Sequence, residues 1–168
     1  MKTLWTPWRI EHVLGKAAKA EHCIFEPPGD THISREDLLL YRNEDGVVLL
    51  NRFPYANGHL LVAPSRHVDC LTGLTEKESS DLMLLLQQST KIVKKHLSPD
   101  GFNIGCNLGK TAGAGIADHL HFHIVPRWDG DHNFITVISD IRTIPEHIEC
   151  TFDNVAPDFT SLYLQKNP

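Results

Sequence analysis

The chain has 168 residues, of which 41% are hydrophobic and 22% are charged, and its 16 basic and 21 acidic side chains give a formal net charge of −5. Because no stretch is rich in Lys and Arg, the sequence lacks the basic surface of nucleic-acid-binding proteins, and we expect no nucleic-acid partner. No stretch approaches 18 apolar residues, so we also expect no membrane-spanning helix and no membrane partner.

The first 37 residues are predicted to be irregular, because they are interrupted by Pro7, Pro27, Pro28 and Gly29. Residues 1–9 contain no apolar core, so we expect no secretory signal in them. The cysteines are widely spaced, at Cys23, Cys70, Cys106 and Cys150. This spacing favours free thiols in a reducing compartment over a disulfide framework, and we expect a cytoplasmic protein.

Three short strands are predicted in the first half of the chain. Residues 38–41 and 47–51 flank a turn at residues 43–46 that contains Asp-Gly, a typical hairpin signal. After a second turn at residues 54–58, the apolar residues 59–63 are predicted to form a strand that ends before a proline.

Residues 74–97 are predicted to form one long helix. Thr75 and Glu78 have the spacing of a capping box, and residues 98–101, which include a proline and a glycine, end the helix. A stripe of helical period predicts the buried face: Leu82, Leu85, Leu86, Ser89, Ile92 and Val93.

The most informative segment follows this helix. Residues 102–108 are predicted to form a strand, and the glycine-rich loop of residues 109–115 then leads into His119, His121 and His123. Alternate positions of a strand face one side, so the three imidazoles line one face. The apolar residues between and after them pack on the other face: Leu120, Phe122 and Ile124.

Three imidazoles on one face indicate a catalytic or metal-binding site, because imidazole exchanges protons near neutral pH and acts as nucleophile or metal ligand. The glycines of the preceding loop let backbone amides approach an anion, which predicts a phosphate site beside the histidines. Asn51 stands at the end of a predicted strand. Its amide would bind a ligand hydroxyl, or it would bond its own backbone in a turn, and both interpretations stay open.

Beyond residue 129 the periodicity weakens. Residues 134–138 are predicted to form a strand, and residues 145–154 a terminal helix with Pro145 near its first position. Strands joined mostly by hairpins, together with one long helix, predict an α+β fold with an antiparallel sheet.

Two segments of the sequence resemble those of a known family. Residues 119–125 match the signature of the histidine-triad (HIT) superfamily, His-x-His-x-His followed by two apolar residues, and residues 51–64 resemble its Asn-Arg-x-Pro…Gly-His-x-Leu-Val-x-Pro block. The resemblance implies a HIT-like fold with a five-stranded antiparallel sheet and one long helix. It also implies a homodimer whose two subunits join into a continuous sheet. We therefore expect residues 1–168 to form a single HIT domain with its core at about residues 38–140.

Finer features are similar to the bacterial diadenosine-tetraphosphate phosphorylases, also called ATP adenylyltransferases. They include the opening residues 5–9 and a run from residue 107 to residue 134. Four residues before the first histidine, many hydrolase-type members carry Gln and the phosphorylase type tends to carry Ser, whereas this chain has Gly115. The resemblance implies cleavage of dinucleoside polyphosphates. Phosphate is the expected acceptor, and water is the alternative.

The resemblance also implies a role for each residue of the site. His121 would be the nucleophile that forms a nucleotidyl-histidine intermediate, with its other ring nitrogen held by a backbone carbonyl. His123 would bond a phosphoryl oxygen or assist the leaving group, and His119 would orient the site or bind metal. The implied nucleotide-binding residues are Asn51 (ribose), Asn107 (phosphate), the backbone amides of Gly113, Ala114 and Gly115, and Trp128 (stacking). Trp128 fits a core or dimer-interface aromatic equally well.

A metal site follows from the same resemblance. Related bacterial members often bind zinc through Cys-x-x-Cys, a later histidine and the first triad histidine, which correspond here to Cys23, Glu26, His67 and His119. Glu26 replaces the second cysteine, and a carboxylate is an acceptable zinc ligand. Zinc would be structural here, since protein ligands fill all four positions, and catalysis would require no cofactor.

Two competing functions remain. The first is a metal-dependent β-protein that uses His-x-His-x-His as ligands; it requires an essential metal with a further carboxylate ligand and leaves the glycine-rich loop unexplained. The second is a nucleotide sensor without turnover, against which the intact His121 argues. Within the leading interpretation, a hydrolase of nucleoside phosphoramidates is a further alternative.

Overall fold

The computed structural model describes residues 22–27, 29, 31–131 and 146–166. Within them, five strands form one antiparallel sheet in the order β1-β2-β3-β5-β4. The strands are β1 (Leu39–Arg42), β2 (Val47–Leu50), β3 (Leu60–Ala63), β4 (Gly101–Cys106) and β5 (Phe122–Arg127). The helices are α2 (Glu76–Leu97) and α4 (Ile148–Lys166), with 3-10 turns η1 (Leu71–Gly73) and η2 (Lys110–Ala112). The predicted α+β fold with an antiparallel sheet is confirmed.

The first hairpin forms as the turn residues predict. The Asn43 side-chain oxygen accepts hydrogen bonds from the backbone N–H groups of Asp45 (2.9 Å) and Gly46 (3.3 Å), and the Asn43 N–H donates to the Gly46 carbonyl. An Asx turn of this kind reverses the chain, so β1 and β2 pair antiparallel.

The long helix α2 is also confirmed, with its capping box. Thr75 accepts from the Glu78 N–H, and the Glu78 carboxylate accepts from the Thr75 N–H at 2.8 Å. Leu74 lies outside the helix because Thr75 is its N-cap residue. The helix ends at Ser98, whose left-handed backbone (φ 46°) closes the last turn. All six residues of the predicted stripe are buried: Leu82, Leu85, Leu86, Ser89, Ile92 and Val93.

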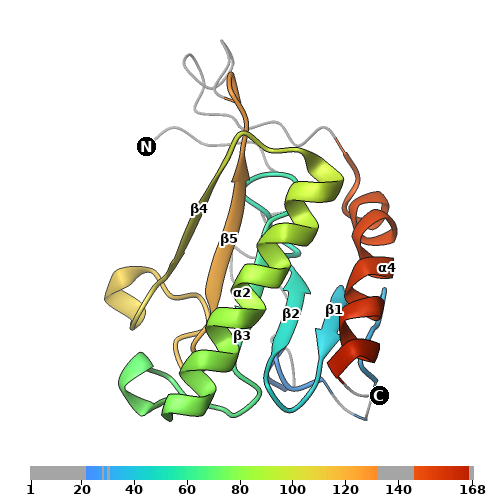
Figure 1. The fold of residues 1–168 in the computed structure, drawn as a ribbon. Coiled ribbons are helices and arrows are strands. Elements are labelled where there is room, and N and C mark those ends of the chain that lie inside the picture. The colour runs from blue at the N-terminus through green and yellow to red at the C-terminus, as the bar shows by residue number, and fades with distance from the viewer. Residues whose placement is uncertain (1–21, 28, 30, 132–145, 167–168) are drawn as a thin grey trace.

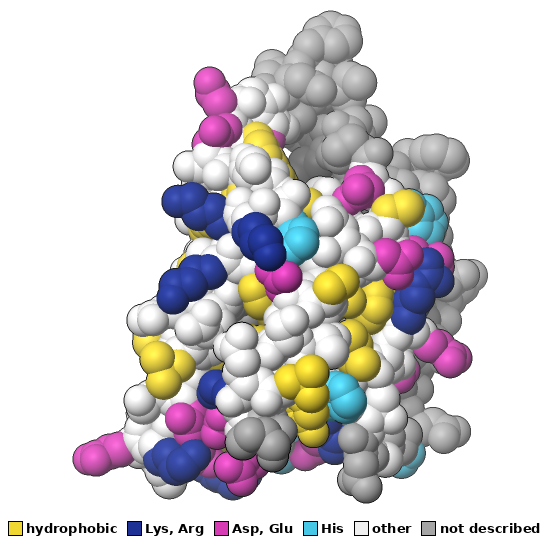
Figure 2. Space-filling view, turned by 45° about the vertical axis from the view of Figure 1, so that its right-hand side comes forward, with side chains coloured by type: hydrophobic (Ala, Val, Ile, Leu, Met, Phe, Trp, Pro, Cys, Tyr) yellow, Lys and Arg dark blue, Asp and Glu magenta, His cyan; other side chains and the backbone are white. Residues whose placement is uncertain are grey.

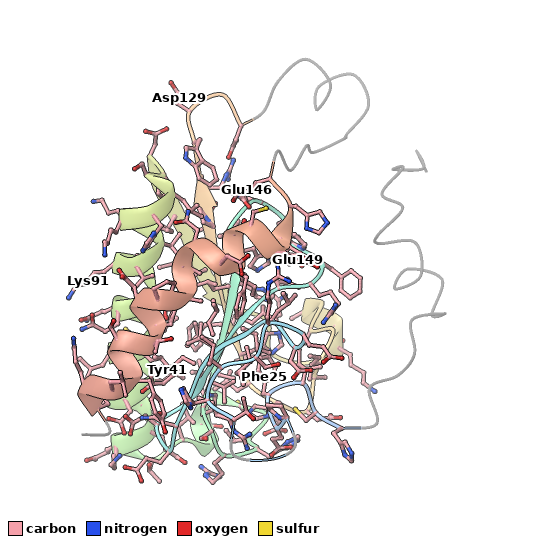
Figure 3. The ribbon with its side chains drawn as sticks, turned by 90° about the vertical axis from the view of Figure 1, so that its right-hand side faces the viewer. Phe25, Tyr41, Lys91, Asp129, Glu146 and Glu149 are labelled. Atoms are coloured by element: carbon pink, nitrogen blue, oxygen red, sulfur yellow. The ribbon has the colours of Figure 1, made fainter. Side chains whose placement is uncertain are left out.

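The sheet has two different faces, and β3 shows the alternation. Leu60 and Val62 belong to the main core under α2 and α4, whereas Leu61 and Ala63 belong to a smaller cluster on the opposite face. Figure 1 shows both helices on one side of the sheet. The smaller cluster includes Phe25, on the side away from α2 (Figure 3). Side chains that stand on this second face are therefore not covered by the helices.

The C-terminal helix is longer than predicted. We expected a helix over residues 145–154, and α4 instead begins at Ile148 and continues through Pro157 to Lys166. A proline disfavours a helix interior in an isolated chain. Burial of apolar side chains on either side of it offsets that cost: Phe152, Val155, Ala156 and Phe159.

Some sequence predictions lie outside the described residues: the strand at residues 134–138, Pro145 and the resemblance at residues 5–9. In the part of the chain that is described, neither long helix has the length and hydropathy needed to cross a membrane. Basic and acidic side chains of the described residues are interspersed over the face shown in Figure 2.

Candidate active site

The three histidines converge on the sheet face opposite the helices. His123 lies in β5 and pairs across the sheet with Leu61 of the smaller cluster, whereas His119 and His121 lie in the segment that leads into the strand. The residues between and after them point to the main core, as predicted: Leu120, Phe122 and Ile124. The expected alternation is confirmed, although regular strand pairing begins only at Phe122.

His121 is held in one tautomer. Its Nδ1 atom lies 2.9 Å from the carbonyl oxygen of His119, and a carbonyl can only accept, so Nδ1 carries the proton. The Nε2 atom therefore keeps its lone pair. The residue is only 5% exposed, so water scarcely competes for this bond. The expected backbone carbonyl is present at Nδ1, and the lone pair lies on Nε2.

A fourth histidine, which the sequence analysis did not assign, fixes His123. The His59 Nδ1 atom accepts a hydrogen bond from the backbone N–H of Tyr55 at 3.1 Å, so His59 carries its proton on Nε2. That Nε2–H donates to Nδ1 of His123 at 2.9 Å. His123 consequently carries its own proton on Nε2 and can donate it to an oxygen of a ligand.

His123 is neutral over a wide pH range. Burial, followed by the nearby His121, lowers its pKa from 6.5 to about 4. A neutral ring with a fixed Nε2–H is a hydrogen-bond donor that does not repel a neighbouring ring. The two histidines therefore have complementary states, a lone pair on His121 and a donor on His123.

Aromatic rings enclose these imidazoles. The Phe25 ring is 1% exposed and lies 5.1 Å from the His119 ring and 5.2 Å from the His121 ring. The Tyr55 ring lies 4.7 Å from the His59 ring. Apolar walls keep water away from the imidazoles, which strengthens their hydrogen bonds. Sequence reasoning missed Phe25, Tyr55 and His59, although His59 lies in the block that resembles the superfamily and begins a predicted strand.

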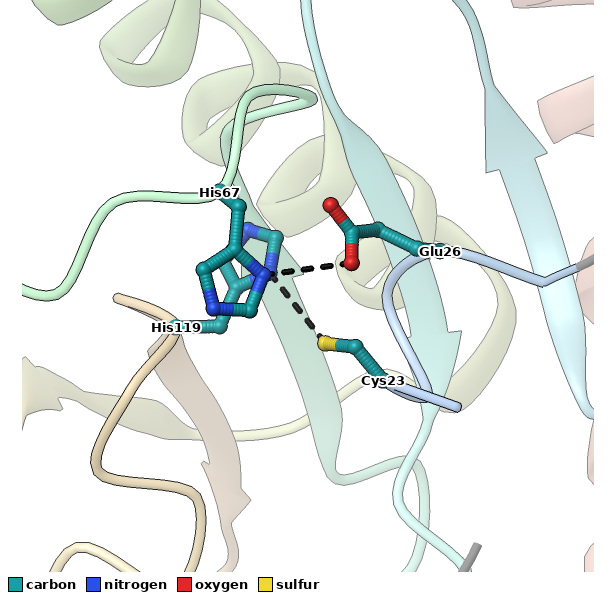
Figure 4. A group of neighbouring side chains, drawn as sticks. All are labelled: Cys23, Glu26, His67 and His119. Carbon is teal, nitrogen blue, oxygen red and sulfur yellow. Dashed lines mark hydrogen bonds and ion pairs between the residues drawn. The ribbon is translucent and has the colours of Figure 1, made fainter. Parts of the chain in front are cut away.

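His119 faces a different group of side chains. Its Nε2–H donates to the Pro64 carbonyl at 3.0 Å, which leaves Nδ1 unprotonated and 3.3 Å from the Cys23 sulfur. Burial lowers the pKa of His119, which favours the same neutral ring. Glu26 lies 3.1 Å from His67. Figure 4 shows the four side chains turned toward one another.

These four residues fit a zinc ion. Their ligand atoms, from Cys23, Glu26, His67 and His119, all lie within 4.8 Å of one another. Tetrahedral zinc with bonds of about 2.0–2.3 Å places its ligands roughly 3.5 Å apart, so closure requires a movement of about 1 Å. Glu26 and His67 are exposed and free to make it. The bond from His119 to a backbone carbonyl is the usual orienting contact of a ligating histidine.

The predicted ribose ligand Asn51 is part of a turn. Its side-chain oxygen accepts from the Phe53 N–H at 3.0 Å, and its side-chain nitrogen lies 3.3 Å from His59 Nδ1. The side-chain amide of Asn51 therefore contacts both the backbone of its own turn and the ring of His59. Asn51 is thus brought to the imidazoles through His59.

The glycine-rich loop folds as a 3-10 turn, η2. The N–H groups of Gly113 and Ala114, which were expected to face a phosphate, donate to the carbonyls of Lys110 (3.0 Å) and Gly109 (3.3 Å). In a tight turn the backbone N–H groups donate to carbonyls of the same turn, and the glycine content of a loop does not predict this bonding. Among the described residues, the amide of Gly115 has no such carbonyl partner. A Cβ atom at Gly113 would lie 4.0 Å from the side-chain nitrogen of Asn107, so Asn107 borders the loop.

Trp128 lies apart from the triad. It follows the end of β5, and its indole N–H donates to the Leu97 carbonyl at 3.3 Å, at the end of α2. At about 3.3 Å per residue, His121 and Trp128 are separated by roughly 20 Å along the strand. This position agrees with the structural interpretation of Trp128, and the structure does not bring it to the histidines of the same chain.

Comparisons with known proteins agree with this geometry. The HIT domain profile matches residues 34–130. A protein of Mycobacterium tuberculosis named AP-4-A phosphorylase is 39% identical over 157 residues, which cover 90% of this chain and 80% of that protein. The bis(5'-adenosyl)-triphosphatase of Dictyostelium discoideum is 36% identical over 93 residues, which cover 55% of this chain and 62% of that protein.

A solved structure has the same fold. A zinc-bound histidine triad family protein from Mycobacterium smegmatis superposes with a TM-score of 0.59 at 28% identity. The superposition covers 74% of this chain and 85% of that one. The profile match includes the histidine segment at residues 119–123.

Proposed function

Since the chain belongs to the HIT domain family, we propose that it is a nucleotide-processing enzyme that cleaves dinucleoside polyphosphates, with His121 as its nucleophile. The observation that carries the proposal is the bond from His121 Nδ1 to the His119 carbonyl, which leaves a lone pair on Nε2. Two relatives support the substrate class, because their names are AP-4-A phosphorylase and bis(5'-adenosyl)-triphosphatase.

In the first step, Nε2 of His121 attacks the α-phosphorus of the substrate. A nitrogen–phosphorus bond forms, the bond from phosphorus to the bridging oxygen breaks, and that oxygen leaves with its electron pair as part of the nucleoside polyphosphate. With diadenosine tetraphosphate, the leaving product is ATP and an adenylyl group stays on His121. Division of one displacement into two easier ones is the gain of covalent catalysis.

His123 acts on the oxygens of the reacting phosphate. Its Nε2–H is oriented by the bond from His59, and the ring stays neutral down to about pH 4, so it donates to the bridging oxygen as negative charge develops there. Asn107 and the amide of Gly115 supply further donors at the loop that precedes the triad. The ribose is bound by Asn51.

In the second step an acceptor oxygen attacks the adenylyl group, the nitrogen–phosphorus bond breaks, and its electron pair returns to Nε2. Phosphate as acceptor gives ADP, whereas water gives AMP and a proton. We favour phosphate because the AP-4-A phosphorylase match covers 90% of the chain. The shorter match to a triphosphatase keeps water as the second candidate.

We further propose a structural zinc ion on Cys23, Glu26, His67 and His119. It would fix the ring of His119, whose carbonyl holds His121, and it takes no part in the chemistry. Among the described residues, the cluster with metal-binding geometry contains only one triad histidine, which argues against a metal held by all three. Metal analysis should find one zinc per chain in the parent and none in Cys23→Ser.

We also propose a homodimer that joins two sheets through β4. This strand is an edge of the sheet, and its residues Asn103, Ile104 and Gly105 are exposed. An apolar edge strand with unpaired backbone groups is a template for pairing with another strand.

The direct test is incubation with diadenosine tetraphosphate, with and without inorganic phosphate, followed by chromatography of the products. We expect ADP and ATP, formed only with phosphate, and a loss of at least 10³-fold in turnover for His121→Asn. AMP and ATP without phosphate would assign water as the acceptor. Turnover of nucleoside phosphoramidates alone, or of no nucleotide, would contradict the proposed substrate class, and equal turnover by His121→Asn would contradict the nucleophile.

A further inference from the structure

The loop between β2 and β3 controls the hydrogen-bond chain that ends at His123. The Tyr55 N–H donates to His59 Nδ1 at 3.1 Å, the shorter of two contacts there, since the Asn51 side-chain nitrogen lies 3.3 Å away. These donors fix the tautomer of His59, and His59 in turn fixes His123. The loop closes tightly at Gly58, whose left-handed backbone (φ 69°) lies against Leu97 of α2. The position of the Tyr55 N–H therefore bears on the hydrogen bond that His59 donates to His123.

Three polar residues tie this loop to the start of α4, and we call them the Asn57 clasp: Asn57, Glu146 and Thr151. The Asn57 side-chain nitrogen donates to the Glu146 carboxylate at 3.0 Å. The Thr151 hydroxyl lies 2.6 Å from the same carboxylate oxygen and 2.8 Å from the Asn57 side-chain oxygen. Figure 3 shows Glu146 at the N-terminal end of α4.

Thr151 is the buried member of the clasp, and Asn57 and Glu146 are half-buried. Thr151 is 1% exposed, and its single hydroxyl proton is shared between two acceptors. The hydrogen bonds from Thr151 and Asn57 lower the pKa of Glu146, so its carboxylate is ionised at neutral pH. Charge-assisted hydrogen bonds are the stronger and more directional kind, and they fix the position of Asn57.

Other contacts already anchor α4. Phe152, Val155 and Phe159 are buried in the main core, and Arg35 pairs with Glu149 and Asp153 on the surface. A polar cluster adds little to such packing, because burial of polar groups is costly and hydrogen bonds largely offset that cost. Its hydrogen bonds are made to Asn57, which lies two residues after Tyr55 and two residues before His59.

We propose that the Asn57 clasp is a positioning device for catalysis, through which α4 holds the loop so that His59 presents its Nε2–H to His123. The inference rests on the proposed function, in which His123 acts on the reacting phosphate. None of the three clasp residues touches the reacting atoms. They act through Tyr55, His59 and His123 in turn.

The kinetic test compares two substitutions of one residue. Thr151→Val removes the hydroxyl at nearly constant volume, and Thr151→Ser keeps it. We expect Thr151→Val to lower kcat on diadenosine tetraphosphate by about tenfold, with KM changed by less than about threefold, and Thr151→Ser to retain at least about half of kcat. A Thr151→Val enzyme with kcat within twofold of the parent would overturn the inference.

A matched control separates position from stability. Val155→Ala leaves a cavity on the same helix, one turn further along, and removes none of the hydrogen bonds of the clasp. We expect it to lower the unfolding temperature at least as much as Thr151→Val and to keep kcat within twofold at temperatures well below unfolding. An equal loss of kcat in both variants would show that the clasp acts only through stability.

A second measurement does not depend on turnover. Nitrogen-15 NMR of labelled histidine reports the tautomer of each imidazole, and we expect His123 to be purely Nε2–H in the parent and mixed in Thr151→Val. If the parent cleaves no dinucleoside polyphosphate, the proposed function fails while this spectrum still decides on the clasp. An unchanged His123 signal in Thr151→Val would overturn the inference in either case.

Discussion

At His121 and His123, the identity of the hydrogen-bond partner decides the chemistry of the ring. A carbonyl oxygen can only accept, so His121 donates from Nδ1, and a backbone N–H can only donate, so His59 relays a proton toward His123. The row of histidines and its face were predictable from period 2 alone. The relay was not, because it depends on the pairing of β3 with β5, which brings together residues 64 positions apart in the chain.

The low pKa of His123 predicts a pH dependence of stability. The folded pKa of about 4 lies below the ordinary value of 6.5, so the unfolded chain binds the proton more tightly. The stabilisation is complete above about pH 6.5 and is lost as the pH falls toward 4. In urea titrations across this range, we expect His123→Gln to show a shallower loss of unfolding free energy than the parent. Parallel curves for the two proteins would show that the His123 pKa is not lowered.

At the scale of elements, signals at helix and turn ends were the most reliable. The capping box of α2 and the Asx turn between β1 and β2 depend on contacts within a few residues, so the sequence contains them in full. The extent of α4 depends on burial against α2 and β1, which no local pattern encodes. For the same reason, the sequence did not reveal that the amides of Gly113 and Ala114 are used within the η2 turn.

The turn before β3 depends on a glycine at position 58. A Cβ atom at Gly58 would lie 2.3 Å from a methyl group of Leu97, and its φ of 69° disfavours any other residue. We expect Gly58→Ala to lower the unfolding free energy by about 2 kcal/mol and to reduce turnover, since the loop must shift. The control is Gly101→Ala, where a Cβ atom meets nothing within 4 Å. A Gly58→Ala protein as stable as Gly101→Ala would contradict this account of the turn.

At the scale of the molecule, the two faces of the sheet carry different groups of residues. One is covered by α2 and α4 and contains the main core, and the other carries the histidines, Phe25 and the candidate metal ligands. The fold class and the face of the histidines could be predicted from the alternation of residues. Phe25 could not, because nothing in the sequence around it indicates contact with residues about a hundred positions later.

The proposed dimer is testable at this scale. Ile104 in β4 is 48% exposed, and a lysine there would place two like charges close together across a symmetric strand pair. We expect sedimentation analysis to show a dimer for the parent and at least tenfold weaker association for Ile104→Lys. Leu164→Lys, at an exposed position of α4, should leave the dimer intact. A parent that is monomeric, or an Ile104→Lys variant that dimerises equally well, would rule out β4 as the interface.

The proposed reaction is a double displacement at phosphorus through Nε2 of His121, and its stereochemical course distinguishes it from a single displacement. The substrate is a single diastereomer of diadenosine tetraphosphate with sulfur on the α-phosphorus, and the configuration of the product is compared with it. For phosphate the product is the thio analogue of ADP, and for water isotope-labelled water makes the product chiral. Two successive in-line displacements predict retention. Inversion would show that the acceptor attacks the substrate directly and that no nucleotidyl-histidine forms.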